Sequence, residues 1–354
     1  MEDQTEEKIN GSGYAVPVSI VIAGIIIASA LLKNGANLNS RTSGIKPSNT
    51  KTATQAVSAS EEAVVPSEGV DLPVVWGDLG AKLVSVGAID AEKMKALYEG
   101  RGEFTPLETD RPEAVVAVPS AGRSLTGFSD EYQNLLLGQN DGKLKITKDN
   151  AGYILNLFWA LGLASKNSIL DSGEMMDARY GGAGPPAGGF ASTAGWTIAK
   201  GDPMDHYSRH KFFNLTPQEQ ALVDKVSKGI YRPCCNNSTH FPDCNHGMAM
   251  LGFLELMASQ GVGEEEMYKA ALAVNSYWFP DTYLTIAAYM KQDGVEWKNV
   301  SPKDVLGINY SSASGYARIS SQVNQPRRGG EGSGCGVDTQ VPVAPQRQQG
   351  GCGV

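Results

Sequence analysis

The sequence is poor in cysteine and carries no excess of basic residues. Only 5 of its 354 residues are cysteine, too few for a fold held together mainly by disulfides. Lysine and arginine together number 30 against 38 aspartate and glutamate residues, so the net charge is −8. Proteins that bind nucleic acid through its phosphates need a basic face, and this balance therefore argues against a nucleic-acid partner.

Several short motifs are also missing. No Cys-x-x-Cys pair occurs, which excludes the usual thioredoxin-type redox motif and the covalent attachment of a c-type haem. The glycine-rich stretch 181–195 has no strand pattern before it and no Lys-Ser or Lys-Thr after it, so it does not match a phosphate-binding loop. We expect residues 181–195 to form a surface loop, and we predict no nucleotide cofactor.

Residues 14–32 form the one long segment rich in aliphatic side chains. These 19 residues carry no charge. As a helix rising about 1.5 Å per residue they would span about 28 Å, close to the thickness of a bilayer core. The charged residues before them are mostly acidic, whereas a cleaved signal peptide usually begins with lysine or arginine. We therefore predict a single uncleaved anchor in the lipid bilayer; cleavage near Ala28, Ser29 and Ala30 is the alternative.

Two features of the sequence predict opposite orientations of this anchor. Only Lys8 precedes it, and four basic residues follow it: Lys33, Arg41, Lys46 and Lys51. The positive-inside rule would then keep the main domain in the cytoplasm. Residues 34–70, however, are rich in Ser, Thr, Ala and Asn, as expected of a stalk. Residues 13–24 also resemble the N-terminal anchors of membrane-tethered extracytoplasmic thiol oxidoreductases of small-genome bacteria, which implies export. We expect a single-pass protein of the cell membrane with an extracytoplasmic domain.

The pattern along the chain predicts a mainly α fold: an N-terminal transmembrane helix, a flexible stalk, a compact helical domain and a disordered tail. The expected boundaries are 1–13 for a short acidic N-terminus, 14–32 for the anchor, 33–71 for the Ser/Thr-rich linker, 72–323 for the helical domain and 324–354 for the tail. From residue 326 the composition is dominated by Gly, Gln, Arg, Pro and Val, which cannot bury a core.

Helix start signals and apolar spacing locate the elements of the domain. The clearest start is Thr216, followed by Pro217 and by Glu219, which completes a capping box for a helix reaching about residue 230. Further helices are expected over 78–86, 90–98, 129–137, 147–163, 246–259, 264–278 and 281–290, with one more beginning at Pro302. The apolar run 114–118 is compatible with a lone short strand.

Nearly all residues that commonly bind transition metals lie in one window. All four histidines fall between His206 and His246, and three of the five cysteines fall between Cys234 and Cys244. Thiolate and imidazole are the ligands that zinc and copper prefer. If residues 205–213 are helical, the rings at 206 and 210 project from one face. The candidate metal ligands are Cys234, Cys235, His240, Cys244, His246, His206 and His210.

Two other uses of these cysteines remain open at this point. In an oxidising compartment Cys234 or Cys235 can pair with Cys244, and the Cys235–Cys244 pairing would close a short structural loop. The protein would then be a disulfide-stabilised structural or interaction module without catalysis. The thiols can also form a redox-active pair. If a metal is bound, the nearby thioethers of Met204, Met248 and Met250 favour copper(I) over zinc.

The cysteine window resembles a known motif. Arg232-Pro233-Cys234-Cys235, followed by His240, Asp243 and Cys244, is similar to the Pro-Cys-Tyr-Cys-Gly-Cys motif of uncharacterised exported proteins. The similarity covers residues 229–273, and this chain departs from it by its adjacent cysteines and by the lack of a second cysteine group. Residues 71–323 also resemble uncharacterised membrane-anchored bacterial proteins. The first resemblance implies a Cys/His site in an exported protein and no particular reaction, and the second adds no chemistry.

The last two cysteines lie in the tail, inside a repeated Gly-Cys-Gly-Val sequence at 334–337 and 351–354. A cysteine flanked by glycines does not suit a packed core. We therefore expect Cys335 and Cys352 to be available for an intermolecular disulfide.

Overall fold

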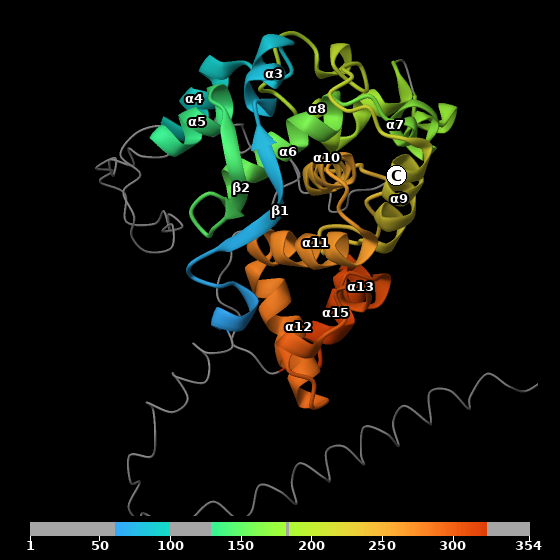
Figure 1. The fold of residues 1–354 in the computed structure, drawn as a ribbon. Helices are drawn as coiled ribbons and strands as arrows, with labels where there is room; N and C mark the ends of the chain where they lie inside the picture. The colour runs from blue at the N-terminus through green and yellow to red at the C-terminus, as the bar shows by residue number, and fades with distance from the viewer. Residues whose placement is uncertain (1–60, 100–128, 182–183, 324–354) are drawn as a thin grey trace, which may run out of the picture. The chain divides into compact units, whose positions relative to one another are not determined.

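The computed structural model describes residues 61–99, 129–181 and 184–323 (Figure 1). The chain divides into two units, 1–53 and 54–354, and every described residue belongs to the second. The described part is mainly helical with one continuous apolar core, as the sequence predicts. The predicted anchor 14–32, the run 114–118 and the tail 324–354 with Cys335 and Cys352 lie outside the described residues.

Two almost entirely buried helices form the centre of the domain, α6 (Ala151–Ala164) and α10 (Asn245–Ser259). Both are apolar all round, which is typical of a helix covered on every side. They meet backbone to backbone at Gly162 and Gly252: a Cβ atom on Gly162 would lie 2.0 Å from the Met248 carbonyl oxygen. Next to this crossing the Phe158 and Phe253 rings stack with centroids 4.8 Å apart. The position of α10 is therefore fixed by α6.

A small antiparallel sheet lies against these helices and was not expected from the sequence. It consists of β1 (Val70–Gly77) and β2 (Asn140–Ile146). On β1 the buried side chains alternate, at Leu72, Val74 and Trp76, as in a strand with one face on the core. On the edge of β1, the Gln260 side-chain amide accepts a hydrogen bond from the Val75 N–H at 2.8 Å and donates one to its carbonyl at 2.7 Å.

The predicted linker 33–71 is too long at its C-terminal end. Residues 61–64 are helical, and Val64 and Val65 are buried in the core. The first strand begins at Val70 rather than after residue 71. The linker prediction failed here because a single buried Val-Val pair carries no periodic pattern, although packing against distant residues orders it.

The helices before α6 begin where the cap residues indicate. They are α3 (Leu79–Ser85), α4 (Ala91–Glu99) and α5 (Asp130–Leu137). Asp90 accepts hydrogen bonds from the first amides of α4, and Ser129 caps α5. Short helical turns then fill the stretch from α6 to residue 205: α7 (Ser168–Ser172), η1 (Glu174–Met176), η2 (Ala178–Tyr180), η3 (Pro186–Gly189), α8 (Ala191–Ala194) and η4 (Pro203–Asp205). The expected loop 181–195 thus contains two of these turns.

In the C-terminal half, α9 and α11 contact α10, and the later helices pack on α11 and on one another (Figure 1). The elements are α9 (Pro217–Gly229), α11 (Glu264–Trp278), α12 (Pro280–Gln292), η5 (Trp297–Asn299), α13 (Pro302–Val305), α14 (Ile308–Ser311) and α15 (Ala313–Ser320). The predicted capping box of Thr216 and Glu219 is present at the start of α9. Within the described ranges, no helix has the length and apolar character needed to cross a membrane.

Candidate metal centre

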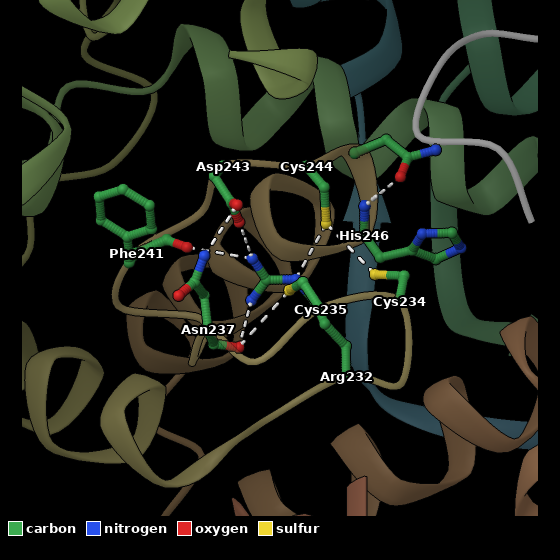
Figure 2. Close-up of polar contacts among 9 residues, drawn as sticks. Arg232, Cys234, Cys235, Asn237, Phe241, Asp243, Cys244 and His246 are labelled. Atoms are coloured by element: carbon green, nitrogen blue, oxygen red, sulfur yellow. Dashed lines mark hydrogen bonds and ion pairs between the residues drawn. The ribbon is translucent and has the colours of Figure 1, made fainter. Parts of the chain in front are cut away.

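The loop between α9 and α10 holds the three cysteines of the domain (Figure 2). Hydrogen bonds fix the start and the middle of this loop. The Thr239 N–H donates to the Ile230 carbonyl at 2.8 Å, and the Tyr231 N–H donates to the Leu306 carbonyl at 2.8 Å. A β-bridge joins Tyr231 and Ser238. The loop is therefore an ordered structure, although it is not part of any helix or long strand.

Arg232 organises the inside of the loop. Its side chain is only 2 % exposed and reaches toward Asn237, Asp243 and Cys244 (Figure 2). Nη1 donates to the Asn237 carbonyl at 3.1 Å, and Nε donates to the Cys244 Sγ at 2.9 Å. Nη2 donates to the Phe241 carbonyl at 3.0 Å and forms an ion pair with Asp243. One guanidinium thus holds four points of the loop, which satisfies most of its donors.

The charge of Arg232 is retained in spite of burial. Burial acts to lower the pKa of Arg232, but the neighbouring Cys244, Cys235 and Asp243 outweigh it and raise the pKa above its ordinary value. For Asp243 burial raises the pKa, while Arg232 and a 2.8 Å hydrogen bond from the Asn237 amide oppose that shift. The guanidinium also lies directly against α10, because a Cβ on Gly247 would be 2.5 Å from the Arg232 Cζ.

The sulfur atoms gather around this guanidinium. The Sγ atoms of Cys234 and Cys244 are 3.5 Å apart, and no disulfide joins the cysteines of the described residues. A hydrogen bond with Cys234 acts to lower the pKa of the Cys235 thiol. A hydrogen bond with Cys244 together with burial outweighs it and raises that pKa to about 11. Of the two cysteines expected to approach Cys244, Cys234 has its sulfur within 3.5 Å.

Cys244 occupies a special position because it is the N-cap residue of α10. The N-terminus of a helix carries a partial positive charge, and thiolates are stabilised there and next to arginine. Cys244 has both features, and it is only 1 % exposed. The helix N-terminus and Arg232 act in favour of the thiolate, which is the form of cysteine that binds metals, whereas burial acts against it.

His246 completes a three-residue donor set. It is the second residue of α10 and only 4 % exposed, and its ring packs on Phe279 with centroids 4.3 Å apart. Its buried Nδ1 has no hydrogen-bond partner among the described residues. One donor atom each from Cys234, Cys244 and His246 lie within 4.8 Å of one another. A buried imidazole nitrogen without a hydrogen-bond partner is energetically unfavourable, unless a ligand such as a metal ion binds it.

The spacing of this donor set suits a transition metal. With metal–ligand bonds of about 2.0–2.3 Å, the donors around one ion lie roughly 3.3–3.8 Å apart. The 3.5 Å separation of the two sulfurs already falls in that interval. A second set within 4.8 Å consists of Cys235, Asp243 and Cys244. The Arg232 guanidinium contacts both Cys244 and Asp243 of this second set. Because this positive charge already lies beside two of its three donors, the second set is less suited to a metal cation than the first.

The other predicted ligands lie in neither donor set. The His240 Nε2 is 2.7 Å from the Asp224 carboxylate on α9. The Nδ1 of His206 and the Nε2 of His210 are 3.2 Å apart, and the His206 Nε2 is 2.9 Å from the Lys200 carbonyl. Burial and the neighbouring His206 and Arg209 lower the pKa of His210. These three histidines are therefore engaged by other partners.

Residues 205–213 do not form a helix, so the condition under which the rings at 206 and 210 would share one helix face is not met. Residues 203–205 make a short 3₁₀ turn, Ser208 has a positive φ of 52°, and residue 210 pairs in a β-bridge with Ser165. The two rings of His206 and His210 meet because the chain turns sharply, not because they share a helix face.

Sequence reasoning missed Arg232, Asn237 and Gly247 as parts of the site. Arg232 precedes the Pro-Cys-Cys sequence by one residue, and an arginine beside cysteines is the signal that was available. Comparisons of the chain with protein-family models, with curated proteins and with solved structures found no match.

Proposed function

We propose that the protein binds a soft or borderline transition metal, copper or zinc, through Cys234, Cys244 and His246. The observation that carries this proposal is the convergence of two sulfurs and one imidazole nitrogen within 4.8 Å. The partnerless Nδ1 of His246 supports it, since a buried polar nitrogen normally has a partner. Two thiolates and an imidazole are a donor set of the kind that zinc and copper(I) prefer.

The charges around the site favour the same interpretation. Two thiolates would bring two negative charges into a mostly buried loop, where unpaired charges are unfavourable. The single positive charge of Arg232 faces both the Asp243 carboxylate and the Cys244 sulfur, so it cannot balance that carboxylate together with two thiolates. A bound cation would supply the missing positive charge. Cys235 lies beside Cys244 and is the nearest candidate for a fourth ligand.

We further propose that the domain is held at the cell membrane by residues 14–32 and faces the extracytoplasmic side. The uncharged stretch and the polar linker after it support this placement. Digestion of intact cells with protease should degrade the domain. A domain that is cut only after the membrane has been permeabilised would refute the extracytoplasmic placement.

Metal titration of the full-length chain tests the binding proposal. The protein is purified in detergent under anaerobic conditions with Cys335→Ser and Cys352→Ser, so that tail thiols do not contribute. We expect about one equivalent of copper(I) or zinc per chain, with affinity measured by competition with a chromophoric chelator. Cys244→Ser and His246→Asn should each weaken binding by about tenfold or more, equivalent to about 1.4 kcal/mol.

His240→Asn is the matched control, because it removes an imidazole from the same loop outside the donor set. It should leave the metal affinity unchanged. Equal losses in His240→Asn and His246→Asn, or no binding by the parent protein, would contradict the proposed site.

A further inference from the structure

We propose that Cys234 and Cys244 also form a reversible redox pair, in which Cys234 reacts first with a peroxide and Cys244 then closes a disulfide. The inference deepens the proposed function, because the same two sulfurs are the proposed metal ligands. It starts from their separation of 3.5 Å, about 1.5 Å longer than a disulfide bond. A small movement of the loop that carries Cys234 is enough to bring the sulfurs into bonding distance.

The two cysteines differ in access, which assigns their roles. Cys234 is partly exposed, whereas Cys244 is 1 % exposed. A dissolved oxidant therefore meets Cys234 first. Cys244 is the residue that attacks from inside, and the protein holds its sulfur in place through the 2.9 Å hydrogen bond from Arg232 Nε. In disulfide formation the attacking species is a thiolate, and the 3.5 Å distance places the Cys244 sulfur next to the Cys234 sulfur that it would attack.

The reaction balances with a hydroperoxide as the oxidant. The Cys234 thiolate attacks one peroxide oxygen, the O–O bond breaks, and Cys234 becomes a sulfenic acid while hydroxide or alkoxide leaves. The Cys244 thiolate then attacks the Cys234 Sγ. The S–S bond forms as the S–O bond breaks, and the departing hydroxide takes a proton from solvent to give water. Two electrons pass from the two sulfurs to the peroxide, and a dithiol reductant reverses the change.

Arg232 acts here as a positioning residue, and Cys235 is the competing thiol. Arg232 Nε and Nη2 connect the Cys244 sulfur to Asp243, so the guanidinium fixes the attacking sulfur relative to the loop. The Cys235 sulfur lies 3.9 Å from the Asn237 carbonyl and shares a donor set with Cys244. A Cys235–Cys244 bond is thus the specific alternative that an experiment must distinguish.

Closing the disulfide has a direct effect on the metal site. Both sulfur ligands are consumed, and only His246 remains of the three-residue donor set. A single imidazole does not hold copper or zinc firmly, so oxidation should release the ion.

The test uses the full-length chain in detergent with Cys335→Ser and Cys352→Ser. The reduced, metal-free protein is treated with one equivalent of hydrogen peroxide, alkylated, digested without reduction and mapped by mass spectrometry. We expect a Cys234–Cys244 cross-link that dithiothreitol removes. The Cys235→Ser variant should give the same cross-link. The Cys244→Ser variant should instead accumulate a sulfenic acid on Cys234, which dimedone traps.

Arg232→Lys should also accumulate the trapped sulfenic acid while peroxide is consumed at the parent rate, and circular dichroism shows whether this variant is folded. A Cys235–Cys244 cross-link, or over-oxidation of Cys234 without any cross-link, overturns the redox proposal. The metal-loaded protein provides the second measurement, in which one ion should be released for each cross-link formed. A protein that forms the cross-link but never binds metal refutes the proposed function and leaves the redox pair established.

Discussion

Replacing Glu255 by glutamine should change how the stability of the domain depends on pH. Glu255 lies in the middle of α10 and is completely buried. Its Oε2 accepts a 2.5 Å hydrogen bond from the Ser165 hydroxyl, and its Oε1 has no partner among the described residues. Burial raises the pKa of Glu255 from 4.5 to about 8, while the side chains of Ser165 and Asn167 oppose the shift. The carboxyl is therefore mostly protonated in the folded protein at neutral pH.

The sign and size of the effect follow from linkage. The folded state binds this proton more tightly than the unfolded state, so the contribution of Glu255 is fully present below pH 4.5 and is lost as the pH rises through about 8. At about 1.36 kcal/mol per pH unit, the interval between these two pKa values corresponds to a loss on the order of 5 kcal/mol. Glutamine has nearly the same shape and cannot ionise, so the variant should not show this loss.

Chemical denaturation of the full-length chain in detergent between pH 5 and pH 9 measures the difference. Near pH 5 the two proteins should have similar free energies of unfolding. Above pH 5 the free energy of unfolding of Glu255→Gln should exceed that of the parent by a growing amount, about 1.4 kcal/mol per pH unit. This difference should become constant above pH 8. Groups that titrate in both proteins, such as His210, cancel in the difference. A difference that stays constant over this range would refute the reasoning.

Three further substitutions test the packing around the site. Gly252→Ala should lower the free energy of unfolding by about 1–3 kcal/mol, because its Cβ would lie 2.5 Å from the Gly162 nitrogen; urea denaturation measures this. Gly247→Ala should displace the Arg232 guanidinium and weaken metal binding in chelator competition. The control for both is Gly152→Ala, because no atom lies within 4 Å of its added Cβ. This control should lower neither the free energy of unfolding nor the metal affinity. Arg232→Met leaves the Asp243 carboxylate without its cation and should lower the free energy of unfolding by about 3–5 kcal/mol, measured by thermal unfolding. A decrease below about 1 kcal/mol would show that the domain does not need this ion pair.

The elements that the sequence predicts well are those whose signals are local. The capping box at Thr216 and Glu219 and the cap at Ser129 involve residues three positions apart, so the pattern and the hydrogen bonds coincide. The strands were not predicted. β1 contains Pro73, and β2 reads Asn-Asp-Gly-Lys-Leu-Lys-Ile, so neither resembles an isolated strand. Their pairing depends on contacts between distant parts of the chain.

The same distinction applies to the candidate site. The predicted ligands Cys234, Cys244 and His246 lie within one short stretch, and the structure brings one donor atom of each within 4.8 Å of the others. His240, by contrast, is taken by Asp224, a residue on the preceding helix, and sequence spacing does not reveal that contact. The role of Arg232 was missed because it depends on burial, and an arginine in a loop is usually exposed to solvent.

The contact between Gln260 and β1 has a consequence for self-association. A strand at the edge of a sheet offers unpaired N–H and carbonyl groups to a strand of another molecule. At Val75 both groups are already bound by the Gln260 amide, which takes the place of a neighbouring strand. Two residues earlier, Pro73 has no N–H to offer. A single glutamine and a single proline thus close this edge of β1 to addition of a further strand, and they protect the domain against edge-to-edge aggregation there.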